Sequence, residues 1–451
     1  MLEESIEFHR GRESVLFKPE DTTPPENEQI NTHAVWAVEL YTPLHAARMI
    51  DGLRALGVDT DQTGFGPPTE SVRRGRSYPL GGSWVNLGLF VPHGSSAFFG
   101  RIPADLPSGV TAAVAYMWTI TSSLSALVVQ FVLTDELEAS VDRTARRNDF
   151  EAKGELLRGS GVTVQPPENV KQAAIDEARK KLRRLPADWI CKHAPGAFAA
   201  RGLDAMPTAE LVTAELGLPF AEETRRIEYM RFLGLGWDPL AWQSDELKGW
   251  RLAFDRGDRF MVVAGRRGDV RAAGQLEHRG SDESWAMAMV ANDYLQKDLV
   301  IWAASQHLVQ CQERLSEIRD AGKGLVSGWF PTVRLKRIGE EFLRDSLDAR
   351  TAAAELKRFS ASDRDFRREA AEWKGVGQFG DRDLLGSFRD AIRANAGALL
   401  SSEERLRDSL LVETTMVSTI ANLRVQRWLL IVTVLAAIAA SVSLYLTVSS
   451  G

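Results

Sequence analysis

The end of the chain is the feature that most constrains its fold. From Trp428 to Gly451 the sequence contains no Asp, Glu, Lys or Arg. About 20 consecutive apolar residues in a helix cross the ~30 Å hydrocarbon core of a bilayer. We therefore predict a transmembrane helix over 428–448. A buried core helix is the alternative, but no later sequence is left to wrap around it.

Basic residues on one side of this stretch predict its orientation. Arg424 and Arg427 directly precede it, and no Lys or Arg follows. Positive charge stays on the cytoplasmic side of a membrane. Segment 1–29 has no apolar run typical of a signal peptide. The sequence thus predicts a single-pass, tail-anchored protein of the plasma (inner) membrane, with its N-terminus in the cytoplasm.

The composition predicts a packed body ahead of this helix. The 451 residues are 44% apolar and 26% charged, which is typical of a chain with two or three globular domains. Cys191 and Cys311 give no disulfide framework and fit a reducing compartment. The net charge of -6 weighs against a nucleic-acid partner, because phosphate binding requires concentrated positive charge. The partners expected are the membrane, other copies of the chain, and a cytoplasmic ligand or protein that the sequence does not identify.

After a flexible N-terminus over 1–30, we expect an α+β or α/β sheet domain over 31–150. Runs rich in β-branched and aromatic residues predict strands at 34–42 and 83–91. An amphipathic pattern that begins with a proline predicts a helix over 43–58.

The uncharged segment 110–133 has two interpretations. A hydropathy window would identify it as a second membrane span. Its Val, Ile, Thr and aromatic content, with a Thr-Ser-Ser interruption at 121–123, favours two buried strands joined by a turn.

Residues 151–282 form a mixed α/β region, which is either a second small domain or part of the first. Helical patterns occur at 169–184 and 221–233. Two strand-like runs flank an Asp-Arg-Gly-Asp turn within 249–269.

Long helices are predicted for the remainder. A helical hairpin covers 283–380, with its second helix over 333–374. A third helix runs from Asp381 to Val448, which corresponds to about 100 Å. Its part over 381–427 is predicted to be a stalk.

Apolar residues follow one stripe of this stalk. They are separated by 4, 7, 7, 4, 7 and 3 residues, as in a supercoiled helix. The stripe, here called the stalk seam, consists of Phe388, Ile392, Leu399, Leu406, Leu410, Val417 and Ile420. It either packs on the two preceding helices of the same chain or joins copies of the chain, and both can hold at once.

Small and hydroxyl-bearing residues follow one face of the predicted membrane helix and the turns before it. This small-residue face consists of Asn422, Gln426, Thr433, Ala436, Ala440, Ser443 and Thr447. Such a face allows close packing of membrane helices. A water-lined pore between several copies is the alternative.

An α/β body, a helical pair and a long stalk helix that enters the membrane resemble the layout of CorA-type divalent-cation channels. The resemblance covers mainly 283–448 and implies that several such helices surround a pore. The Gly-Met-Asn signature and second membrane helix of those channels have no counterpart here, so no selectivity residue is implied.

Motifs of catalysis and metal binding are sparse. The sequence has no Walker A loop, no G-x-G-x-x-G, no H-E-x-x-H and no G-x-S-x-G elbow. Segment 59–70 matches some EF-hand positions, but two prolines in its late part and the lack of an exiting helix favour a surface loop. Cys191 and His193 are too few ligands for a zinc site.

Two further clusters have ordinary structural interpretations. Trp237, Trp242 and Trp250 line a ligand pocket or, more simply, belong to the core. Arg143, Arg146 and Arg147 are interpreted as a solvated helix face. We predict no catalytic, cofactor-binding or metal residue, and the sequence identifies no cofactor.

The leading hypothesis is a non-enzymatic, tail-anchored protein that self-associates through its stalk and membrane helices. Its cytoplasmic domain would sense or recruit a partner, as in a signalling or defence component. The alternatives are a CorA-like single-span cation channel and a membrane-tethered enzyme without a recognisable motif.

Overall fold

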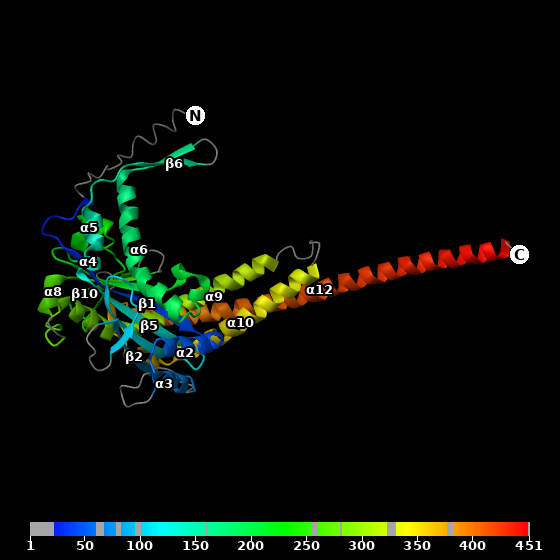
Figure 1. Ribbon diagram of the computed structural model, residues 1–451, viewed down its shortest axis with the longest axis horizontal. Coiled ribbons are helices and arrows are strands. Elements are labelled where there is room, and N and C mark those ends of the chain that lie inside the picture. The colour runs from blue at the N-terminus through cyan, green and yellow to red at the C-terminus, as the bar shows by residue number, and fades with distance from the viewer. Residues whose placement is uncertain are drawn as a thin grey trace. The chain divides into compact units, whose positions relative to one another are not determined.

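The computed structural model describes residues 22–59, 67–77, 83–94, 101–157, 161–254, 260–279, 282–322, 331–376, 380 and 382–449. The chain divides into two compact units. The sheet unit comprises Met1–His307 and Arg358–Arg393, and the helical unit comprises Leu308–Lys357 and Ala394–Gly451. Three helices contribute to both units, namely α9 (Glu283–Gly322), α10 (Pro331–Ala361) and α12 (Leu384–Ser449) (Figure 1).

A ten-stranded mixed sheet organises the sheet unit, in the order β12-β9-β10-β11-β8-β1-β5-β4-β2-β3. Its neighbouring strands are antiparallel except for the parallel pairs β11–β8 and β2–β3. The strands are β1 (Ile30–Tyr41), β2 (Ser83–Pro92), β3 (Arg101–Ala104), β4 (Val110–Thr119), β5 (Ser125–Leu133), β8 (Thr208–Ala214), β9 (Trp242–Ser244), β10 (Trp250–Phe254), β11 (Phe260–Arg266) and β12 (Trp373–Gly375). Strands from the predicted regions 31–150 and 151–282 thus belong to one sheet. A separate two-stranded sheet contains β6 (Lys153–Leu157) and β7 (Gly161–Gln165).

The centre of the sheet is covered on both faces. The Trp36 indole on β1 donates to Asn292 Oδ1 of α9 at 3.2 Å. On the opposite face, Trp189 of α6 (Pro167–His193) packs edge-on against Phe131, with ring centroids 6.0 Å apart. Successive strand residues point to opposite faces, so cover on both sides explains why every residue of β1 is buried.

The uncharged segment 110–133 forms strands, as the preferred interpretation predicted. β4 and β5 pair antiparallel from Val110↔Leu133 to Thr119↔Ser125. All of β5 is buried. Apolar residues therefore occur without alternation because neither face meets water.

Short helices connect the strands. The α-helices are α2 (Ala46–Ala55), α3 (Pro68–Gly75), α4 (Asp135–Glu138), α5 (Ser140–Arg146), α7 (Glu228–Phe232), α8 (Arg267–Ala272) and α11 (Asp363–Arg367), and the 3-10 helices are η2 (Pro43–His45), η3 (Ala199–Arg201), η4 (Leu203–Ala205) and η5 (Glu222–Arg226). The predicted strands at 34–42 and 83–91 are confirmed, and the predicted helix over 43–58 forms as η2 and α2.

Side-chain bonds join the three helices of the helical unit. Arg314 on α9 pairs with Asp345 on α10, with Nε and Oδ2 3.0 Å apart. Gln312 Nε2 on α9 donates to the carbonyl of Asn395 on α12 at 2.8 Å. Leu315, Phe342 and Leu399 are buried in this unit.

The predicted helix over 333–374 is wrong in its last part. α10 ends at Ala361, and the Ser362 hydroxyl caps α11 by accepting a hydrogen bond from the backbone of Asp365. The chain then forms β12, which pairs with β9 from Trp373↔Ser244 to Gly375↔Trp242. Pairing with a distant strand overrides the local helical pattern.

The predicted transmembrane helix over 428–448 is also wrong. Across the described residues, no helix is both long and apolar enough to cross a bilayer. α12 itself continues as a helix to Ser449. The tail anchor, the single-pass plasma-membrane location with a cytoplasmic N-terminus, the CorA-like conduction and the membrane-tethered enzyme all depended on this span and are withdrawn.

Candidate functional site

The first part of the stalk seam packs within the chain. In the sheet unit, Ile392 is fully buried and the Phe388 ring lies edge-on to Phe254, with ring centroids 5.8 Å apart. In the helical unit, Leu399 and Leu406 are buried. These four side chains are buried within the single chain.

Burial along α12 ends within one turn. Glu403 is 1% exposed and accepts a hydrogen bond from Arg350 Nη1 of α10 at 3.4 Å and another from Arg407. Beyond Leu406, no described side chain of α12 is buried. Leu410 is half-buried, and the side chains of Val417 and Ile420 lie outside the described residues. Glu403 and Leu406 therefore mark the boundary of the intramolecular bundle.

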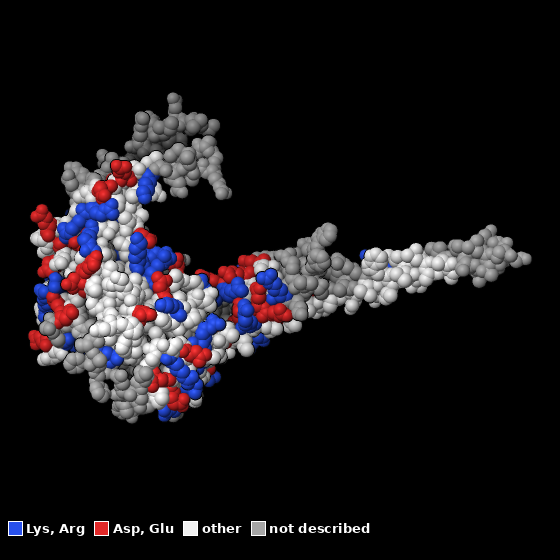
Figure 2. Space-filling model, in the orientation of Figure 1, with Lys and Arg blue, Asp and Glu red and all other residues white. Residues whose placement is uncertain are grey.

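Large apolar side chains continue past this boundary but are exposed. They are Leu411, Val412, Met416, Leu423, Val425, Trp428, Leu429, Leu430, Ile431, Val432, Val434 and Leu435. From Trp428 to Val432 their exposed fractions range from 45% to 68%, and five successive residues cover every side of a helix. Figure 2 shows charged side chains spread over the sheet unit and the near part of the helical unit, and almost none on the described distal part of α12. We call the described part of α12 from Arg407 to Ala440 the uncovered segment.

The small-residue face lies mostly on the uncovered segment. Asn422, Gln426, Thr433, Ala436 and Ala440 are exposed, and the side chains of Ser443 and Thr447 lie outside the described residues. The Thr433 hydroxyl donates to the Leu429 carbonyl at 2.7 Å, so its proton is satisfied within the helix. The pore interpretation of this face depended on the membrane span and is withdrawn with it.

A histidine that the sequence analysis missed joins four elements of the sheet unit. His33 Nε2 on β1 lies 2.7 Å from Thr213 Oγ1 on β8. Its Nδ1 lies 3.1 Å from Glu138 Oε2 on α4 and 3.0 Å from Ser284 Oγ on α9. The order hydroxyl, imidazole, carboxylate is that of a catalytic triad.

Burial argues against catalysis at this site. Thr213 and His33 are each 1% exposed and Glu138 is 4% exposed, so substrate has no path to the hydroxyl. The network instead ties α4 and α9 to the sheet. No sequence motif predicts this network, because His33, Glu138, Thr213 and Ser284 are far apart along the chain.

The metal-site candidates do not assemble. Among the described residues, no three His, Cys, Asp or Glu side chains are grouped to hold an ion. Burial raises the pKa of Cys191 to about 11, so this side chain stays a thiol, and burial also lowers the pKa of His193. In the EF-hand-like segment, Asp59 accepts a hydrogen bond from the Thr69 backbone at 3.0 Å. Residues 60–66 lie outside the described residues, and α3 follows them where no helix was expected.

The tryptophan and arginine clusters have mainly structural roles. Trp242 and Trp250 are buried, whereas Trp237 is 38% exposed beneath the Arg225 guanidinium. The solvated-face interpretation fails for Arg146, which donates to the backbone carbonyls of Pro24, Pro25 and Glu28. That arginine holds the segment leading into β1.

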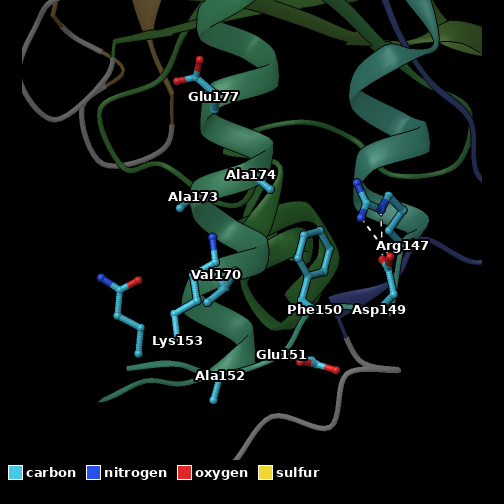
Figure 3. A pocket seen from close by; sticks show the side chains of 11 residues that line it. Arg147, Asp149, Phe150, Glu151, Ala152, Lys153, Val170, Ala173, Ala174 and Glu177 are labelled. Carbon is cyan, nitrogen blue, oxygen red and sulfur yellow. Dashed lines mark hydrogen bonds and ion pairs between the residues drawn. The ribbon is translucent and has the colours of Figure 1, made fainter. Parts of the chain in front are cut away.

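A cavity of about 590 Å³ lies beside the first turns of α6 (Figure 3). Val170, Ala173 and Ala174 provide its apolar side. On the opposite wall, Arg147 and Asp149 form two hydrogen bonds of 2.9 Å, so their charges compensate each other. The cavity thus combines an apolar side with one compensated ion pair, which is weaker support for a function than the uncovered segment.

The sequence matches no family model and no curated protein. The resemblance to CorA-type channels stays a prediction of layout.

Proposed function

We propose that this protein is a self-assembling scaffold in which the uncovered segment of α12 brings several copies of the sheet unit together. The observation that carries the proposal is the mismatch at Leu406, where intramolecular burial ends while the apolar pattern continues. A scaffold of this kind would act by raising the local concentration of whatever the sheet unit binds.

The energetic argument starts from the exposed side chains. Fully burying a Leu, Val or Met side chain contributes about 1.5–3 kcal/mol relative to leaving it in water. The uncovered segment carries twelve large hydrophobic side chains that are exposed in the single chain. Contiguous apolar surface of this extent is typical of an interface.

The helix itself also requires a partner. At 1.5 Å per residue, the segment from Leu410 to Ala440 extends about 45 Å. Helices in water obtain most of their stability from packing an apolar face. Among the described residues, helix pairing within the chain ends near Glu403, which favours a partner outside the chain for the remainder.

A second copy fits this requirement because the seam spacing continues. From Leu410 the next seam positions follow at steps of 7 and 3, the spacing of helices that wind around each other. The step of four from Leu406 to Leu410 is an ordinary step of such a seam, so one register continues from Ile392 to Ile420. The spacing is unchanged where intramolecular burial ends, so the same stripe can pack on helices of the chain before Leu406 and on a second copy after it.

Light scattering on the full chain tests the proposal. The triple variant Leu410→Gln, Val417→Gln and Ile420→Gln should lower the measured mass to that of one chain. The matched control Val412→Gln, Met416→Gln and Leu423→Gln removes three of the exposed apolar side chains but leaves the seam intact, so it should lower the mass much less.

Three outcomes would overturn the proposal. The full chain could be a monomer at all concentrations, or both variants could dissociate equally, which indicates nonspecific apolar contact. The third is a chain that sediments with phospholipid vesicles and remains monomeric on them.

A further inference from the structure

Charged residues are rare on the uncovered segment and in the sequence that follows it. From residue 409 to residue 451 there are three, namely Glu413, Arg424 and Arg427. Side chains three or four residues apart are neighbours on a helix, and no residue of opposite charge lies within four residues of any of the three. None of them therefore has an ion-pair partner in the adjacent turns of its own helix.

The carboxylate of Glu413 shows what this spacing leaves behind. The side chain is half-buried, and its Oε2 atom is shielded from solvent. In the part of the chain that the structure describes, this oxygen accepts no hydrogen bond. Shielded polar atoms in proteins are normally hydrogen-bonded, so the oxygen favours a donor from outside the chain.

The stalk seam runs through all three charged positions. Its steps of 7 each pass over one position of the alternating 3 and 4 spacing, and Glu413 is the position passed over after Leu410. Beyond Ile420, the same spacing leads to Arg424 and Arg427. The charges thus lie on the stripe that the proposed function assigns to a second copy.

We propose that two copies pair antiparallel along this stripe, with Glu413 of each copy beside Arg424 of the other. The alignment that places Val417 beside Ile420 gives this pairing, because the same offset sets every seam position of one copy against a seam position of the other. The inference specifies the partner in the proposed function and rests on it.

Parallel pairing is disfavoured by the same charges. In a parallel pair in register, each seam residue faces its own counterpart, so Glu413 faces Glu413 and each arginine faces itself. Like charges opposite each other act against an interface. An antiparallel pair shifted by seven residues in either direction sets Glu413 against Val417 or Ile431, which are both apolar.

The proposed pair has two-fold symmetry, so each copy contributes the same surface. The two ion pairs between Glu413 and Arg424 consequently form together. A single substitution changes both of them at once, which makes charge reversal a sensitive test.

Light scattering on the full chain, at a concentration where the wild type is assembled, tests the orientation. Glu413→Arg and Arg424→Glu each replace both ion pairs by like-charge contacts, so each should lower the mass toward that of one chain. The double variant sets opposite charges beside each other again and should recover the wild-type mass. Asp408→Arg is the matched control, because it makes the same charge change at an exposed residue off the seam and should leave the mass unchanged.

Single variants that keep the wild-type mass would overturn the antiparallel pairing, because a parallel pair has like charges at each position before and after one reversal. A double variant that stays at the mass of one chain would overturn it as well. Both results leave the assembly in place and remove only its orientation. A wild-type chain that is a monomer at all concentrations removes the assembly and the orientation together.

Discussion

The sheet unit and the uncovered segment of α12 differ in which side chains they bury and which they leave exposed to water. The sheet unit buries charged groups and provides a partner for each, as at Glu210, which is fully buried between Arg179 and Arg183. The uncovered segment leaves apolar side chains in water and has few charges. Buried charges that are paired need no partner from outside the chain, whereas exposed apolar side chains are the reason for the assembly proposed above.

The largest effect is expected at the buried ion pairs of the sheet unit. Glu210→Ala should lower the free energy of unfolding by about 3–5 kcal/mol, because it leaves two guanidinium groups buried without their carboxylate. Asp204→Asn is the matched control, since it breaks the exposed pairs with Lys180 and Arg184 on the same helix, and should cost less than about 1 kcal/mol. Urea denaturation measures both, and equal losses would contradict the distinction.

A second prediction compares two leucines of α12 directly. Leu399 is fully buried, and Leu411 is 61% exposed. Leu399→Ala should cost about 2–5 kcal/mol because it opens a cavity, whereas Leu411→Ala should stay within about 0.5 kcal/mol. Urea denaturation at low protein concentration checks the pair. A large loss at Leu411 under those conditions would mean that a partner within the chain covers it.

The sequence predicted those elements whose own residues carry the signal, either an uninterrupted apolar run or the absence of a helix breaker. β4 and β5 were predictable because burial on both faces leaves an uninterrupted apolar run. The course of α12 was predictable from the absence of proline between 381 and 448. Both signals depend on the residues of the element alone.

The parts that were missed depend on distant partners. β12 has only three residues and exists because β9 pairs with it. The network around His33 joins β1, β8, α4 and α9. The division of the seam at Leu406 depends on where α9 and α10 accompany α12, which residue spacing along α12 does not encode.

A third prediction concerns pH and the interior of the sheet unit. Glu39 on β1 is fully buried and accepts hydrogen bonds from the backbones of Leu40, Phe198 and Ala199. Burial raises its pKa to about 7 despite these bonds. The unfolded carboxyl ionises near pH 4.5, so this group stabilises the fold below that pH, and the contribution is lost as pH rises to 7.

The contribution of Glu39 should appear as a decrease in stability of up to about 1 kcal/mol per pH unit. Glu39→Gln should remove this slope between pH 4.5 and 7, as measured by urea denaturation at several pH values. A variant with the wild-type slope would assign the dependence to another group.

The smallest effects on stability are expected at Glu403, where the intramolecular bundle ends and the uncovered segment follows. Arg350 and Arg407 are each about half exposed, and both contact the buried carboxylate of Glu403. Either arginine can satisfy Glu403 alone, so Arg350→Met and Arg407→Met should each cost about 1 kcal/mol or less. The double variant leaves the carboxylate buried without a cation and should cost more than the sum of the two. Unfolding free energies of the four chains form a double-mutant cycle. Simple additivity would show that the two arginines do not share the stabilisation of Glu403.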